Sequence, residues 1–152
     1  AHFADKTSLL IAVRLAHLYA LLEDLRRAVD GLIADPARNN ARAEVPALLT
    51  PWLSLYREDP DFARLFLIQS TLKDGQYTRD FVRACSGMEA EVGRAIHVLV
   101  ARGALRSNVA AALLTQAVIA FHYHVIVGFS LCQLTDEAQQ TALMQDLLGL
   151  LL

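Results

Sequence analysis

Apolar residues recur at alternating intervals of three and four along most of the chain, which is the spacing of an amphipathic α-helix. The first such segment covers residues 5–30, with Asp5 as the expected N-cap. Gly31 and Asp35-Pro36 are the two expected stops. Its stripe would bury one side of the helix and leave the charged residues outside. The stripe consists of Ile11, Leu15, Leu18, Leu22, Leu25 and Val29.

A second long stripe predicts a helix over residues 76–102. Gly87 and Gly93 lie inside this segment and weaken it, because glycine is a poor helix former. Arg102 and Gly103 give a strong stop, since glycine readily takes the left-handed conformation that ends many helices. The residues expected to share the buried face are Tyr77, Phe81, Cys85, Met88, Val92, Ile96 and Leu99.

The four prolines all fall between residues 36 and 60, which makes this the irregular part of the chain. A helix over 44–57 would be kinked at Pro51, and the kink would open space for a cavity. A further helix over 60–73 would be capped by Asp59, with proline at its first position.

Two helices are expected at the C-terminal end, over 107–132 and 135–152, with Thr135 capping the second. They complete a set of six helices, so the pattern predicts an all-α fold. From Ser107 to Thr135 the chain carries no Asp, Glu, Lys or Arg. That stretch exceeds the roughly 20 residues that span a bilayer. Its polar arc and the acidic residues that follow it argue against a membrane.

A helix that is apolar around most of its circumference is buried on more than one side. In a domain of this size one side can face its own core, and we expect the other to face a second copy of the chain. A central core helix in a monomer is the alternative. The residues predicted at this homodimer interface are Ala110, Ala117, Phe121, Gly128, Phe129, Leu147 and Leu151.

The composition suits one domain. A chain of 152 residues can bury a substantial core, and 55% apolar against 20% charged residues leaves apolar surface for a partner. The net charge of −2 gives no electrostatic footprint for nucleic acid. Cys85 and Cys132 have no metal or redox spacing and fit a reducing compartment. Because the segment 5–30 is charged throughout, it is not a signal peptide, and we predict a cytoplasmic location.

Motifs of enzymes and metal sites are absent from the sequence. His122 and His124 lie two apart on a predicted helix, so their imidazoles point in nearly opposite directions and cannot share a metal ion. His124 falls on the more apolar arc, where a core or interface histidine is the default and a ligand contact is the alternative. We therefore predict no catalytic residue, no metal, no cofactor and no enzymatic activity.

A ligand cavity could form where the helices over 44–57, 60–73 and 76–102 meet. Aromatic side chains with a few polar groups suit a small apolar or aromatic molecule, and ordinary core packing is the alternative for each residue. The predicted cavity residues are Trp52, Tyr56, Phe66, Gln69, Phe81, Cys85 and Met88, with His124 from the next helix.

Three segments resemble the TetR/AcrR family of transcriptional regulators. His2-Phe3, followed by Lys6 and an apolar run, is similar to the junction at which the family's helix-turn-helix leads into a long connecting helix. Residues 59–67, Asp-Pro-Asp-Phe-Ala-Arg-Leu-Phe-Leu, resemble a segment that follows the second helix of its sensor domains. Residues 101–106, Ala-Arg-Gly-Ala-Leu-Arg, resemble the junction into the first dimerisation helix.

The resemblance implies a six-helix antiparallel bundle of the TetR C-terminal sensor type, whose last two helices form a four-helix bundle with a second copy. Residues 1–6 would be the remnant of an N-terminal helix-turn-helix domain. Residues 7–152 would be the effector-binding and dimerisation domain of a bacterial repressor that leaves its operator when a small apolar ligand binds. His2 and Lys6 match positions that contact the DNA backbone. The alternatives are a helical-bundle enzyme or cofactor-binding protein, or a purely structural dimerisation module.

Residues 1–152 alone are not expected to bind DNA specifically, because they carry a net charge of −2 and no recognition helix. In an electrophoretic mobility-shift experiment at physiological salt, promoter fragments should form no specific complex with this chain. A sequence-specific complex that survives such conditions would contradict the assignment.

Overall fold

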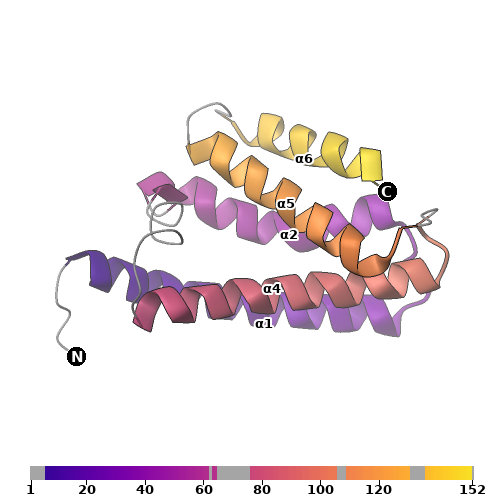
Figure 1. Cartoon of the computed structure of the whole chain (residues 1–152), viewed down its shortest axis with the longest axis horizontal. Helices are drawn as coiled ribbons and strands as arrows, with labels where there is room; N and C mark the ends of the chain where they lie inside the picture. The colour runs from indigo at the N-terminus through magenta and orange to yellow at the C-terminus, as the bar shows by residue number, and fades with distance from the viewer. Residues whose placement is uncertain (1–5, 62, 65–75, 106–108, 131–135, 152) are drawn as a thin grey trace.

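The computed structural model describes residues 6–61, 63–64, 76–105, 109–130 and 136–151. Within these ranges the regular structure is helical and contains no strand, which confirms the all-α prediction. The helices in Figure 1 are α1 (Lys6–Ala34), α2 (Ala41–Glu58), α4 (Gln76–Ala101), α5 (Ala111–Ser130) and α6 (Glu137–Leu151).

The predicted helices agree with these bounds to within a few residues, apart from two places. The helix expected over 5–30 continues through Gly31 to Ala34. In the segment 60–73, the described residues 60, 61, 63 and 64 are helical, and the rest lies outside the described part of the chain.

Helices α1 and α4 lie side by side and run in the same direction (Figure 1). Ion pairs fix their register, because Arg26 lies 3.5 Å from Glu91 and Asp30 lies 2.7 Å from Arg94. This pair departs from the antiparallel arrangement that the sequence resemblance implies. The reason is that α2 runs back along the bundle, so the chain begins α4 at the same end as α1.

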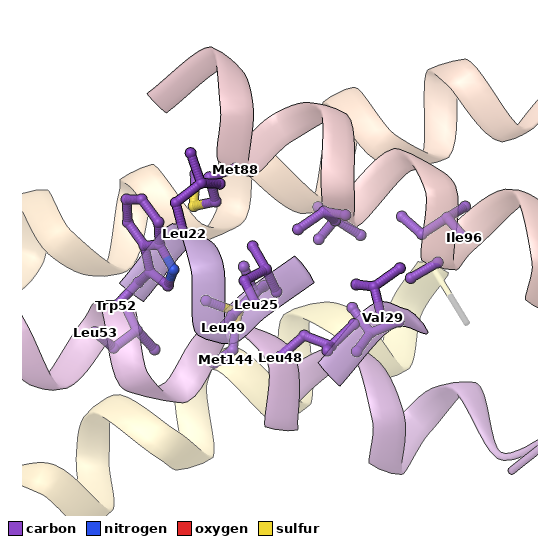
Figure 2. Close-up of a cluster of buried hydrophobic side chains, with 14 of the residues drawn as sticks. Leu22, Leu25, Val29, Leu48, Leu49, Trp52, Leu53, Met88, Ile96 and Met144 are labelled. Atoms are coloured by element: carbon purple, nitrogen blue, oxygen red, sulfur yellow. The ribbon is translucent and has the colours of Figure 1, made fainter. Parts of the chain in front are cut away.

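The interface between α1 and α4 forms much of the core. The α1 stripe is buried as predicted over Leu15–Val29 and extends to Leu32, whereas the side chain of Ile11 lies outside the description. Figure 2 shows this cluster continuing into α2 and α6 through Leu48, Leu49 and Met144. On α4, Cys85 is half-buried, and the other described residues of the predicted face are fully buried: Phe81, Met88, Val92, Ile96 and Leu99.

Arg102 determines where α1 ends. Its guanidinium donates hydrogen bonds to the backbone carbonyls of Leu32 and Ile33 at 2.9 and 2.8 Å, and to Asp35 at 3.2 Å and Arg38 at 3.3 Å. These carbonyls include orphan acceptors of the last helical turn, and a cation there also favours the negative end of the helix dipole. Of the two predicted stops, Gly31 lies inside the helix, and Asp35-Pro36 directly follows its end at Ala34. Arg102, some 70 positions away, satisfies the carbonyls that the end leaves open.

Two helix termini use local signals. Gly103 has φ +70°, and the amides of Gly103 and Ala104 donate to the carbonyls of Val100 and Leu99, which is the Schellman arrangement. The predicted stop at Gly103 is therefore confirmed. At the start of α6, the Asp136 carboxylate accepts the Gln139 amide at 2.8 Å. Asp136 thus acts as an N-cap of α6. The sequence predicts Thr135 in this role, and residue 135 lies outside the part of the chain that the structure describes.

Gly87 allows α1 and α4 to approach closely. A β-carbon at this position would lie 2.7 Å from Cδ2 of Leu22, a side chain that is itself buried. At Gly93, by contrast, a β-carbon would meet Thr115 at 3.4 Å, which is close to ordinary contact. Both glycines lower the helix propensity of α4, as the sequence indicates. Only at Gly87 would an added side chain clash with a neighbouring helix.

Replacing each glycine by alanine should separate these two effects. Gly93→Ala should raise the free energy of unfolding by up to about 1 kcal/mol, which is the helix propensity gained. Gly87→Ala gains the same propensity but forces Leu22 to move, and overpacking typically costs about 1–3 kcal/mol. Urea unfolding of both variants measures the difference. Equal stabilisation by the two substitutions would contradict the close approach at Gly87.

Candidate functional site

A cavity of about 240 Å³ lies between α2, α4 and α5. Helix α2 contributes Tyr56, and α5 contributes Ile119, His122, Tyr123 and Ile126. The six remaining lining residues come from α4. Those residues are Phe81, Val82, Cys85, Ser86, Met88 and Glu89.

Four of the predicted ligand residues line this cavity together. They are Tyr56, Phe81, Cys85 and Met88. Tyr56 comes from α2, and the other three come from successive turns of α4, whose spacing of four and three keeps them on one face. The prediction that these helices enclose a common space agrees with this geometry.

The other predicted ligand residues lie elsewhere. Trp52 is buried but lines a smaller cavity of about 190 Å³ between α1 and α2, beside Pro51. Phe66 and Gln69 lie outside the described residues. His124 is exposed and does not line the larger cavity, so the expectation that it faces the apolar side is wrong.

His122 occupies the buried position instead. Its side chain is 3% exposed, and its Nδ1 atom is buried without a hydrogen-bond partner. Such atoms are uncommon, because leaving a buried polar group unpaired costs about 1–3 kcal/mol. The winding of the sequence onto a helix assigns His122 to the polar arc and His124 to the more apolar one, and this assignment is wrong because α5 is apolar nearly all the way round. The buried side of α5 can be recognised from intervals of three and four residues. They connect the buried residues Thr115, Val118, His122 and Val125.

The titratable groups inside the cavity are neutral near pH 7. Burial lowers the pKa of His122 to about 4, so its imidazole carries no charge. Burial also raises the pKa of the Cys85 thiol to about 12. The pKa of Tyr56 is raised well above its usual value, first by burial and then by the neighbouring Cys85 and Tyr123. The cavity therefore presents polar but uncharged groups, and Glu89, at an exposed position, supplies a carboxylate at its edge.

The predicted dimer residues do not share one exposed face. Ala110 is exposed, whereas Gly128 is buried and Ala117 is half-buried. Phe121, together with Leu147 and Leu151 of α6, is half-buried against the chain's own core. The side chain of Phe129 lies outside the description. Ala110, Ala117 and Gly128 therefore do not form a continuous outward surface.

A different apolar face is open on the last two helices. Leu113 on α5 is 58% exposed and Leu150 on α6 is 81% exposed. Figure 1 shows that the start of α5 and the end of α6 lie at the same end of the bundle. Ala112, Gln116 and Ala120 are exposed as well, and α5 carries no formal charge apart from what its histidines can acquire.

Among the described helices, α5 is long and apolar enough to cross a membrane, with 39% of Ala111–Gly128 buried. The core helix of a soluble protein passes the same test, so this finding is weak evidence for a membrane. In the part of the chain that the structure describes, no group of three or more His, Cys, Asp or Glu side chains could hold a metal ion. His2 and the side chain of Lys6 lie outside that part.

Comparisons with protein families, curated proteins and solved structures find no match to this chain. The cavity and the exposed α5 face are therefore interpreted from their own geometry and chemistry.

The buried imidazole should make stability depend on pH. The unfolded chain takes up a proton at His122 near pH 6.5, whereas the folded chain does so only near pH 4, so acidification favours the unfolded state. Between pH 7 and pH 5 this group should remove about 2 kcal/mol from the free energy of unfolding. His122→Leu should remove most of this pH dependence, and His124→Leu, at an exposed position of the same helix, should retain it. Urea unfolding at the two pH values tests this, and an unchanged pH profile in His122→Leu would contradict the assignment.

Proposed function

We propose that this chain is the effector-binding and dimerisation domain of a TetR-type transcriptional repressor, with a helix-turn-helix encoded upstream reading the operator. The observation that carries the proposal is the cavity between α2, α4 and α5, which is lined by His122, a residue whose Nδ1 is buried without a hydrogen-bond partner. Ordinary core packing fills such a space and pairs such an atom. A cavity that remains open and keeps an unpaired polar group is well suited to a small molecule.

Further support comes from the sequence segments that resemble the family. Residues 101–106 include Arg102, which binds carbonyls at the end of α1, and Gly103, which terminates α4. In the proposed bundle of six helices, these residues join the sensing part to the dimerisation helices. In the proposed sensor domain, α1 and α4 run parallel to each other, so the bundle is not purely antiparallel.

The packing of α4 provides a route from ligand to DNA reader. Cys85 and Met88 line the cavity, and Gly87, in the same turn, contacts Leu22 of α1 without any intervening side chain. A ligand that displaces this turn of α4 toward α1 presses on Leu22, which is buried between the two helices. In the proposed repressor, α1 leads back to the DNA-reading domain. A ligand with different affinities for the two positions of α1 then shifts the population away from the DNA-binding state.

Dimerisation is proposed through the exposed parts of α5 and α6. In a single chain, Leu113 and Leu150 remain largely in contact with solvent on helices with few charges, and such apolar surface marks interaction sites. A second copy, placing the same two helices against these, would bury them in a four-helix bundle. The proposal includes a cytoplasmic location and no membrane.

The dimer can be tested with a matched pair of substitutions. Leu113→Glu places a charge on the proposed interface, and Val13→Glu places one on α1 at 59% exposure, almost equal to the 58% of Leu113. Both changes leave the folded monomer with an exposed carboxylate, but only the first would bury that charge in a dimer. Light scattering should give twice 16.7 kDa for the wild type and for Val13→Glu, and 16.7 kDa for Leu113→Glu. A wild type that is monomeric at micromolar concentration would contradict the dimer.

Ligand binding can be tested by thermal unfolding in a screen of small uncharged aromatic and aliphatic molecules. A ligand that binds the folded state alone adds about 2.7 kcal/mol at a hundredfold excess over its dissociation constant. For a chain of this size each kcal/mol raises the melting temperature by about 2–4 °C. Trp52 borders the smaller cavity, so its fluorescence is a secondary readout.

A control for the same screen is available at Cys85. Cys85→Leu extends a side chain into the cavity and should abolish the shift, whereas Cys85→Ala leaves the space open and should preserve it. A screen in which no molecule shifts the wild type, or in which Cys85→Leu shifts equally, would remove the sensor function.

A further inference from the structure

One residue of the cavity lining, His122, has a buried polar atom without a hydrogen-bond partner. His122 lines the cavity, it is 3% exposed, and its Nδ1 has no hydrogen-bond partner. A leucine or isoleucine would fill the same position without the cost of a buried unpaired nitrogen. A ligand that forms this hydrogen bond removes the cost of the unpaired nitrogen when it binds. It should therefore bind more tightly than a molecule of the same shape without a polar group.

The charges around the cavity restrict the ligand further. Among the described lining residues there is no Lys or Arg, and the one formal charge is the carboxylate of Glu89. Burial of His122 holds its pKa at about 4, so the imidazole stays neutral and supplies no cation. A carboxylate or phosphate ligand would enter without a partner for its charge, which is strongly unfavourable in a buried site. An uncharged ligand avoids this cost.

The volume sets the size. An apolar cavity of about 150 Å³ is known to take up benzene in another protein. The cavity here measures about 240 Å³ and has aromatic and aliphatic walls from Phe81, Met88, Ile119 and Ile126. It therefore accommodates one aromatic ring with a short substituent.

We propose that the effector is an uncharged, single-ring aromatic molecule whose hydroxyl group forms a hydrogen bond with the imidazole of His122. A neutral imidazole has one donating and one accepting nitrogen, and a hydroxyl group can pair with either. A phenol also presents an apolar ring to the walls of the cavity. This inference rests on the proposed sensor function, since it names the ligand class of that same cavity.

The test compares three probes by isothermal titration at pH 7. They share a ring and a methyl group, and they differ in the polar substituent: 4-methylphenol, toluene and 4-methylbenzoate. In the wild type, 4-methylphenol should bind about tenfold more tightly than toluene, because a net hydrogen bond of about 1.4 kcal/mol corresponds to a factor of ten. 4-Methylbenzoate should bind more weakly than either.

Variants identify the residue responsible. His122→Leu should bind the phenol and toluene with similar affinity, whereas His124→Leu, an identical change outside the cavity, should retain the tenfold preference. His122→Gln keeps a hydrogen-bonding group and should retain part of it. Independently of any variant, the imidazole ¹⁵N resonances of His122 in the wild type should move on addition of 4-methylphenol and stay in place with toluene.

Each outcome separates this inference from the function on which it rests. If toluene and 4-methylphenol bind equally, if 4-methylbenzoate binds most tightly, or if His122→Leu keeps the preference, the ligand class is wrong and the sensor function stands. Unmoved His122 resonances in the presence of bound 4-methylphenol have the same meaning. If none of the three probes binds and the broader screen of hydrophobic molecules also fails, the proposed function fails together with the inference.

Discussion

The close contact between α1 and α4 at Gly87 is the constraint on which the other features of this fold depend. Leu22 of α1 occupies the space that a side chain at Gly87 would need. At the other end of the same pair, Arg102 binds the last carbonyls of α1. Together with the ion pairs Arg26–Glu91 and Asp30–Arg94, these contacts set the register over the C-terminal halves of the two helices. With one face of α4 held against α1, its neighbouring face turns toward α2 and α5 and borders the cavity.

The cavity is a place where the chain gives up stability. A buried imidazole whose Nδ1 has no partner lowers the free energy of unfolding, and the cost grows as the pH falls from the pKa of the free side chain, 6.5, to that of the folded one, about 4. Sites that bind ligands commonly show such a cost, because groups prepared for a ligand are unsatisfied until it arrives. The same turn of α4 contacts α1, so a change in the cavity reaches a helix that lies on the opposite side.

The regular helices of this protein follow directly from sequence periodicity. The α1 and α4 stripes are buried where the spacing of three and four predicts, and Gly103 closes α4 as expected. Long-range contacts lie beyond such reasoning. Glycine at position 87 looks like a defect in a helix until Leu22 is seen beside it, and the end of α1 depends on Arg102, which is distant in sequence.

The candidate site was partly predictable for a related reason. Tyr56, Phe81, Cys85 and Met88 lie on helices whose polar and apolar faces differ clearly, so their common orientation can be read from the sequence. Helix α5 has apolar residues on nearly every side, and its pattern does not say which side meets the core. For this reason His122 is buried where the sequence favours His124. For the same reason Ala117 and Gly128, predicted at the dimer interface, are not exposed.

The central claim is that the space between α2, α4 and α5 takes up a small molecule. The chain has two methionines, of which Met88 lines this cavity and Met144 lies on α6 away from its lining. Both can be labelled with ¹³C at the methyl group and followed by NMR while toluene or 4-methylphenol is added. The account predicts that the Met88 resonance moves progressively and saturates, while that of Met144 moves little. If neither resonance responds at millimolar ligand, or if both shift equally without saturation, the cavity is not a binding site.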